Sequence, residues 1–293
     1  MYVSSVLQKS LFYSFVFLPL VTFYLATPKI AFADIGLSFG LYTSDKPTTL
    51  VKKFRPILNE LEKDLSHRMN TKVSIKLSIA RSYEQGINAL AEGKVDFSRF
   101  GPASYILARE KNPDISLLAM EVKNGHKHFK GAICVHKDSK TNKISELKNK
   151  RFAFGDERST IGRYLSQQYL YERGIKSKDL TLYDYLGRHD KVGYAVAQGK
   201  FDAGALKEST LKKLIKKGLP LRAIARFDNV SKPWVARKGL EPEVRAALKK
   251  ALLGLNDKDV LKAIKKDGFA ETNYQDYERV SQAIKLNKKF FSE

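Results

Sequence analysis

The chain has 293 residues, of which 43% are hydrophobic and 29% are charged, which is typical of a globular protein and excludes a disordered or fibrous one. Its 53 lysines and arginines outnumber its 31 acids and give a formal charge of +22, so the expected partners are anionic: a nucleic acid, a membrane or a small anion. The single cysteine, Cys134, excludes an internal disulfide and lies in an apolar run, where we expect a small buried side chain.

The first 33 residues have the pattern of a secretory signal peptide. Lys9 precedes the apolar run 11–26, and Ala31-Phe32-Ala33 has the small residues of a cleavage site. The run of about 16 residues is short for a bilayer span, which needs about 20. We therefore expect cleavage after Ala33, a periplasmic location and a mature chain that does not span the membrane. An uncleaved membrane anchor is the alternative.

Strand and helix patterns alternate through the first part of the mature chain. An apolar stripe with helical spacing runs along residues 48–67: Leu50, Phe54, Ile57, Leu58, Leu61 and Leu65. The expected order is strand 35–42, helix 48–67, strand 72–78, helix 82–92, strand 95–98, helix 102–111 and strand 115–122.

The same alternation returns after about residue 128. The expected strands are 130–136, 151–154, 180–185, 203–206 and 221–227, and the expected helices are 160–173, 191–198, 208–217, 241–253, 258–266 and 275–286. Alternation of this kind indicates mostly parallel sheets with crossover helices.

No flexible linker separates the two halves. We therefore expect an α/β protein with two lobes joined by extended strands. The predicted lobes are residues 34–125 plus 230–293, and residues 126–229.

The basic residues are dispersed, and most fall on predicted solvent faces of helices. Aromatic residues are not interleaved with them as in a stacking platform for nucleic acid. This pattern favours solvation and the steering of an anionic solute over nucleic-acid binding.

A strand followed by a hydroxyl-rich turn at a helix start is the most informative local pattern. Residues 151–162 read RFAFGDERSTIG, with Ser159 and Thr160 at the expected helix N-terminus. The first N–H groups of a helix have no partner within it and attract anions. The alternative is that Ser159 is only a helix cap.

Three further segments place polar groups after predicted strands. They contain Ser104 and Tyr105, then His189 and Asp190, and finally Asp202. Because ligands of open α/β sheets gather at the carboxyl ends of strands, these segments predict one shared cleft. Motifs for catalysis, a cofactor or a metal site are missing from the sequence, so we expect a binding protein and not an enzyme.

Together these segments resemble the periplasmic phosphonate/phosphite/phosphate-binding proteins of ABC importers. The resemblance runs from about residue 36 to 280, and its motifs are SYEQGINA at 82–89, GPASY at 101–105, FGDERSTIG at 154–162, GRHD at 187–190 and FDAGA at 201–205. It implies the fold of type II periplasmic binding proteins, with a ligand cleft between two α/β lobes that close on a tetrahedral phosphorus oxyanion.

The resemblance also implies roles for individual residues. Ser159 and Thr160 would hold the oxygens, Tyr83 and Tyr105 would cover them, and His189 would donate a hydrogen bond. Asp190 and Asp202 would bind N–H or O–H groups of the ligand. Whether Arg158 or Arg163 touches the ligand stays open at this point.

One departure from the family pattern concerns selectivity. Ile161 stands where the family loop often has a second serine, which removes a hydroxyl donor. With the two acids, this predicts tighter binding of a phosphonate or phosphite than of phosphate. The alternative is that Ile161 points into the core and Asp202 only caps a turn.

The implied function is a monomeric solute-binding protein that needs no cofactor and delivers its ligand transiently to an inner-membrane ABC permease. Two alternatives are a receptor that reports to a membrane sensor kinase and a secreted enzyme acting on phosphoesters.

Overall fold

The structure is a computed structural model that describes residues 1–2, 33–43 and 47–292. Nearly all of the expected signal peptide lies outside the described residues. Residues 33–293 form one compact unit. Within the described ranges, no helix is both long and apolar enough to cross a membrane.

The first sheet has six strands in the order β11-β4-β10-β3-β1-β2. The strands are β1 (Ile35–Tyr42), β2 (Val73–Ala80), β3 (Phe97–Arg99), β4 (Ser116–Val122), β10 (Pro233–Ala236) and β11 (Gly268–Ala270). Its helices are α1 (Pro47–Met69), α2 (Tyr83–Ala91), α3 (Pro102–Lys111), α7 (Pro242–Gly254) and α8 (Lys258–Ile264).

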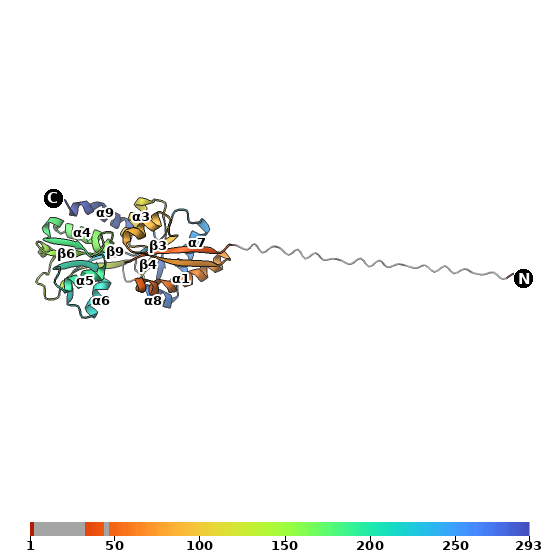
Figure 1. Cartoon of the computed structure of the whole chain (residues 1–293), viewed down its shortest axis with the longest axis horizontal. Helices are drawn as coiled ribbons and strands as arrows, with labels where there is room; N and C mark the ends of the chain where they lie inside the picture. The colour runs from red at the N-terminus through yellow and green to blue at the C-terminus, as the bar shows by residue number, and fades with distance from the viewer. Residues whose placement is uncertain (3–32, 44–46, 293) are drawn as a thin grey trace. The chain divides into compact units, whose positions relative to one another are not determined.

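The second sheet has five strands in the order β7-β6-β8-β5-β9. They are β5 (His128–His136), β6 (Arg151–Phe154), β7 (Leu182–Tyr185), β8 (Ala203–Lys207) and β9 (Leu221–Val230). The π-helical turn η2 (Thr160–Tyr164) leads into α4 (Leu165–Tyr171), and α5 (His189–Ala197) and α6 (Glu208–Lys216) follow. Figure 1 shows α4, α5 and α6 around this sheet and α1, α7 and α8 around the first.

Four strands of each sheet run in the same direction, which confirms the expectation of mostly parallel sheets, and the remaining strands run against them. Strand β10 lies antiparallel between β3 and β4, and β5 lies antiparallel between β8 and β9. The direction of β10 follows from the connection between the sheets, since only residues 231 and 232 separate β9 from β10. Because no crossover helix intervenes, the chain enters the first sheet against the direction of its parallel strands.

The apolar stripe of α1 was predicted correctly. The buried side chains of this helix are the six expected ones. They pack in a core with Phe39 and Trp234, whose rings stack with their centroids 4.7 Å apart. Burial of each such side chain stabilises the fold by about 1.5–3 kcal/mol, which explains why periodicity predicted this element well.

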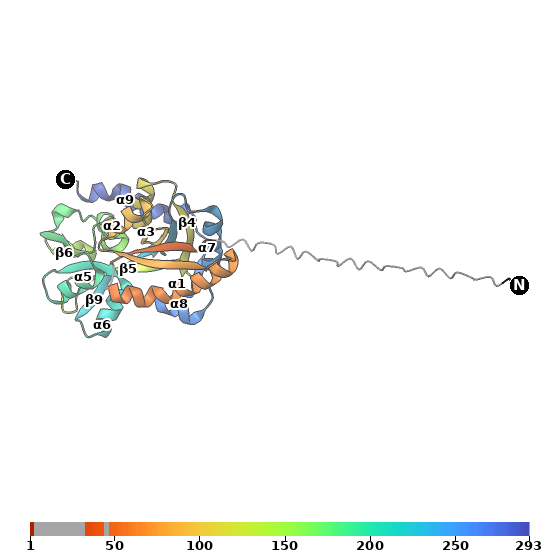
Figure 2. The same ribbon diagram turned by 45° about the vertical axis from the view of Figure 1, so that its right-hand side comes forward.

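The last helix, α9 (Glu278–Phe290), contacts both halves of the fold. Helices α7 and α8 return to the first sheet as expected, but α9 packs against α4 as well as α3. The views in Figures 1 and 2 both place α9 alongside α3. Its Asn287 amide donates to Gln167 Oε1 at 2.6 Å, and Phe290 meets the edge of Phe154. Helix α9 therefore holds the two sheets together.

Cys134 is fully buried in β5. Burial raises the pKa of its thiol to about 12, so the side chain stays protonated and unreactive at neutral pH. This confirms the expectation of a small apolar side chain.

Candidate functional site

Several helices begin where strands of the two sheets end. In the first sheet α2 follows β2 and α3 follows β3, and in the second sheet η2 follows β6 and α5 follows β7. The N-cap residues of α3 and α5, Gly101 and Arg188, make no side-chain capping hydrogen bond of their own. N–H groups at such helix starts form an environment suited to an anion.

Tyr42 organises the half of this junction that belongs to the first sheet. Its hydroxyl accepts a hydrogen bond from the Gly101 N–H at 2.8 Å and lies 2.9 Å from Ser104 Oγ. Its ring packs on Tyr83 with the centroids 3.9 Å apart. Tyr42, Tyr83 and Ser104 are all buried. The sequence analysis missed Tyr42, although its place at the end of a predicted strand was a usable signal.

Ser159 and Thr160 lie in the loop between β6 and η2. Ser159 Oγ accepts from the Gly162 N–H at 3.0 Å, so this hydroxyl does cap the helix start. Thr160 Oγ1 accepts from the Ala103 N–H of α3 at 2.9 Å. The Thr160 hydroxyl thus bonds to the first turn of a helix on the other sheet.

The turn itself depends on two glycines in close contact. The Gly155 N–H donates to the Gly162 carbonyl at 2.8 Å. A β-carbon on Gly162 would lie 2.7 Å from Gly155 Cα and 3.0 Å from Ser159 Cβ. Any larger residue must therefore push the two arms of the loop apart.

We expect Gly162→Ala to lower the free energy of unfolding by about 1–3 kcal/mol, because the added methyl group overpacks the turn. Urea denaturation measures the change. Gly254→Ala is the matched control, since a β-carbon there meets nothing within 4 Å and alanine favours the helix it ends. Equal denaturation midpoints for the two variants would contradict the packing argument.

A second contact joins the same loop to α2. Arg158 donates to Glu84 Oε1 at 2.9 Å. Arg163 instead donates to the Glu157 carbonyl, and its guanidinium lies over the Tyr185 ring. The two arginines are thus engaged within the protein, and Arg158 and Thr160 both link the sheets.

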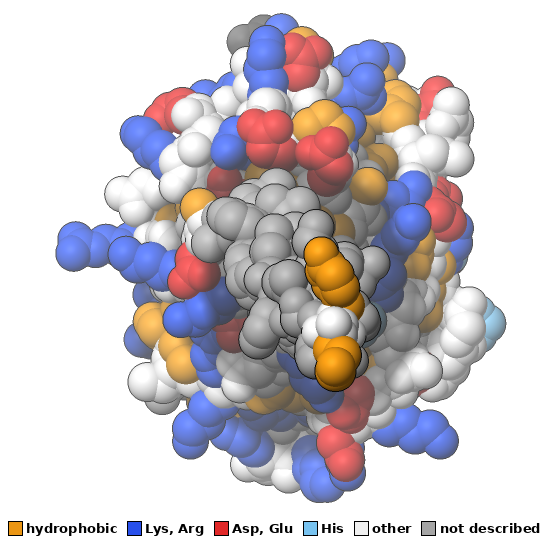
Figure 3. Space-filling model, turned by 90° about the vertical axis from the view of Figure 1, so that its right-hand side faces the viewer, with side chains coloured by type: hydrophobic (Ala, Val, Ile, Leu, Met, Phe, Trp, Pro, Cys, Tyr) orange, Lys and Arg blue, Asp and Glu red, His pale blue; other side chains and the backbone are white. Residues whose placement is uncertain are grey.

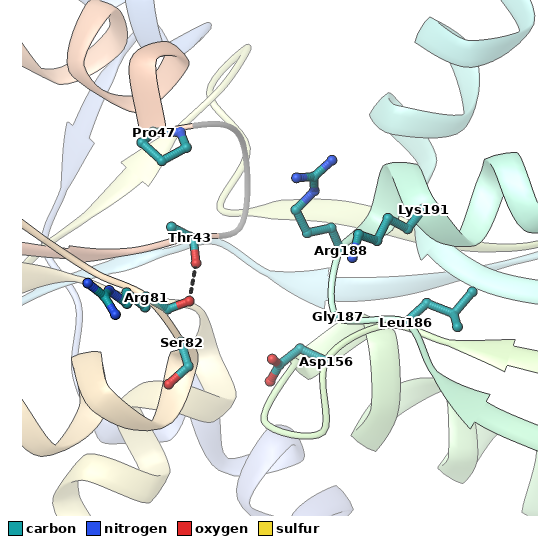
Figure 4. Close-up of a pocket in the computed structure, with 9 residues that line it drawn as sticks. All are labelled: Thr43, Pro47, Arg81, Ser82, Asp156, Leu186, Gly187, Arg188 and Lys191. Carbon is teal, nitrogen blue, oxygen red and sulfur yellow. Dashed lines mark hydrogen bonds between the residues drawn. The ribbon is translucent and has the colours of Figure 1, made fainter.

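A polar cavity of about 340 Å³ lies beside these contacts. Figure 4 shows Thr43, Arg81 and Ser82 on one side and Asp156 and Arg188 on the other. Burial raises the pKa of Asp156 above its ordinary value, although its carboxylate accepts from the Arg158 N–H at 2.7 Å. Ser159 and Thr160 do not line this cavity.

His189 begins α5 and is almost fully buried. Its Nδ1 has no hydrogen-bond partner in the described part of the chain. Burial, together with the charges of Lys207 and Lys232, holds the pKa of His189 well below its usual value. The imidazole is therefore neutral at pH 7. The next residue, Asp190, forms an ion pair with Arg188 at 2.8 Å.

Asp202 and Tyr105 do not lie where the resemblance implied. Asp202 precedes β8 and binds Arg151 at the start of β6, at distances of 2.8–3.2 Å, so it lies at the amino ends of these strands. Tyr105 lies in the core, where its ring meets that of Tyr277 edge-on with the ring centroids 5.1 Å apart. Sequence motifs gave their neighbourhood but not the direction of their side chains.

Ile161 also differs from the expectation. It is buried in the core and packs beside Gly131 of β5. The expectation that Ile161 offers the ligand an apolar surface is therefore wrong. Neither Ile161 nor Asp202 supports the expected preference for a phosphonate or phosphite over phosphate.

Comparison with known proteins agrees with this architecture. Residues 39–277 match the family model of the periplasmic substrate-binding protein of the phosphonate ABC transporter. A probable ABC transporter phosphite-binding protein, PhnD1 of Prochlorococcus marinus, is 28% identical over 98% of this chain and 97% of its own. The phosphate-import protein PhnD of Mycolicibacterium smegmatis is 24% identical over 80% of this chain and 75% of its own.

A solved structure shows the same fold. PhnD1 of Prochlorococcus marinus in complex with methylphosphonate superposes with a TM-score of 0.77 at 27% identity, covering 86% of this chain and 98% of that one. The fold and site thus define a two-lobed periplasmic substrate-binding protein, which binds its ligand without transforming it. The chain belongs to the family of phosphonate-binding proteins of ABC transporters.

Proposed function

We propose that this protein captures a small phosphorus oxyanion between its two sheets and delivers it to an ABC permease of the inner membrane. The observation that carries the proposal is the hydrogen bond from the Ala103 N–H to Thr160 Oγ1. This bond holds the Thr160 hydroxyl, which follows β6 of the second sheet, against the start of α3, which follows β3 of the first sheet. The N–H groups of such a helix start attract anions.

The ligand would replace this direct contact when the sheets separate and close again. Its oxygens would accept from the first N–H groups of α3, from the hydroxyls of Ser159, Thr160 and Ser104, and from Tyr83. A buried oxyanion needs a donor for each oxygen because desolvation of a charged group is costly. Neutral His189 would be a further donor from α5.

The two moving parts would be residues 34–125 with 230–293, and residues 126–229, although α9 belongs to both by its contacts. The chain crosses between the sheets at residues 123–127 and at 231–232. Short crossings of this kind allow hinge closure, in which the ligand shifts an equilibrium between open and closed states.

We propose further that residues 1–33 are a signal peptide, that the mature chain is a periplasmic monomer, and that it meets the permease only transiently. Cleavage after Ala33 would leave a single residue, Asp34, before β1. Mass spectrometry of the exported protein tests this cleavage site. A mass that still includes residues 1–33 would contradict it.

A thermal-shift series tests the proposed ligand class. Methylphosphonate, phosphite and phosphate are added to the whole mature protein, with sulfate and acetate as controls. A ligand at 100 times its dissociation constant adds about 2.7 kcal/mol, which for a protein of this size raises Tm by about 5–10 °C. Shifts with a phosphorus oxyanion but not with the controls are expected. A shift with sulfate alone, or with none of the compounds, would refute the function.

A further inference from the structure

A second and larger groove, of about 1340 Å³, lies next to the cavity of Figure 4. It is bordered by α1 and the loop after β4 on the side of the first sheet, and by α5 and α6 on the side of the second. Leu186, Arg188 and Lys191 line both the groove and the cavity, so the two hollows adjoin at the start of α5.

The lining of this groove is strongly basic. It contains fourteen lysines and arginines but only three acids, a formal excess of eleven positive charges. Each acid is already paired: Glu121 with Arg99, Asp190 with Arg188, and Glu208 with Lys212. Elsewhere the charges mix, and Figure 3 shows one face on which acidic side chains lie among the basic ones.

Three cations of the lining stand at the end of a strand or next to one. Arg99 ends β3, Lys207 ends β8, and Lys232 lies in the two-residue crossing from β9 to β10. Lys207 and Lys232 are half-buried. A half-buried side chain has fewer rotamers to lose when it binds an anion than a fully exposed one has.

The buried His189 connects this charge to the proposed oxyanion site. It begins α5, and the charges of Lys207 and Lys232 contribute to lowering its pKa. Helix α5 packs against β8, and the start of α5 and Lys207 both lie at the carboxyl ends of the parallel strands β7 and β8, while Lys232 lines the same groove. This positive charge attracts anions in general, but phosphite and methylphosphonate carry no second anionic group for it to bind.

We propose that Lys207 and Lys232 bind a second anionic group, so that the preferred ligands are small organophosphonates with a carboxylate or another acidic group at their far end. This rests on the proposed function and names its substrate class. A ligand with a terminal ammonium group would be repelled by the same lysines.

Titration calorimetry of the whole mature protein in 150 mM salt tests the inference. The probes are methylphosphonate, 3-phosphonopropionate and 2-aminoethylphosphonate. We expect 3-phosphonopropionate to bind at least tenfold more tightly than methylphosphonate, and 2-aminoethylphosphonate to bind more weakly than either.

The variant Lys207→Met with Lys232→Met should reduce affinity for 3-phosphonopropionate at least tenfold more than affinity for methylphosphonate. Lys285→Met is the control, because this lysine is exposed on α9 outside the groove, and it should leave both affinities unchanged. Should the half-buried lysines prove necessary for folding, Lys213→Met with Lys217→Met on the exposed rim should lower the preference about threefold.

The outcomes separate the inference from the function on which it rests. Methylphosphonate binding without a preference for the second acidic group, or a preference that survives the lysine variants, overturns the inference alone. Absence of binding by every phosphonate overturns both. Displacement of 3-phosphonopropionate by a 20-base-pair DNA duplex would assign the groove to nucleic acid and also overturn the inference.

Discussion

Replacing Ser159 with alanine and Thr160 with valine in one variant is expected to weaken oxyanion binding at least a hundredfold. Each hydrogen bond from a hydroxyl to a charged oxygen contributes about 1.5–3 kcal/mol, and about 1.4 kcal/mol corresponds to a factor of ten. Calorimetry with methylphosphonate measures the loss. The melting temperature shows whether the loop still folds.

Thr181→Val is the matched control for this variant. Thr181 is exposed just before β7, at the opposite ends of the strands, and its substitution should leave the affinity unchanged. An affinity for methylphosphonate within threefold of the native value, with normal melting of the double variant, would show that the two hydroxyls do not hold the ligand.

The largest expected effect on stability comes from Glu121. This carboxylate is fully buried and accepts from Arg99 at 2.6 and 2.9 Å, with Lys266 Nζ 3.5 Å away. Glu121→Gln leaves the largely buried Arg99 and Lys266, whose side chains are 15% and 13% exposed, without this counter-charge, so we expect a loss of about 3 kcal/mol in the free energy of unfolding. Urea denaturation at pH 7 measures it.

The same residue predicts the response of stability to pH. Burial raises the pKa of Glu121, but the charges of Arg99 and Lys266 outweigh burial and lower the pKa to about 2. Because the pKa is depressed in the folded state, its stabilisation is present above the ordinary value of 4.5 and is lost as the pH falls toward 2. The loss amounts to about 3 kcal/mol.

The difference between native protein and Glu121→Gln should therefore shrink between pH 5 and pH 2. Glu60→Gln is the control, since Glu60 forms a surface ion pair with Lys63 at 3.7 Å and should change stability by less than 1 kcal/mol. A difference for Glu121→Gln that stays constant over this range would contradict the assigned ion cluster.

Most of the fold was predictable because hydrophobic periodicity determines it. The α1 stripe, the alternation of strands and helices and the helix starts at Ser82 and Pro102 all rest on local spacing. The antiparallel strands β10 and β11 were not predicted, because their pairing is decided by partners far away in the sequence.

The candidate site was predictable as a region and less so as a set of side chains. Thr160 and Ser104 lie at the junction of the sheets, whereas Asp202 binds Arg151 and Tyr105 faces Tyr277. Strand ends can be located from sequence, but the direction of a side chain depends on packing. For the same reason the lysines were expected on separate solvent faces, although several of them line one groove.

A crystal structure of the mature protein with methylphosphonate would test the central claim most directly. We predict the phosphorus between the two sheets, with oxygens about 3 Å from Thr160 Oγ1 and from the first N–H groups of α3. Methylphosphonate bound only in the lysine-rich groove, or outside the junction of the sheets, would contradict the account.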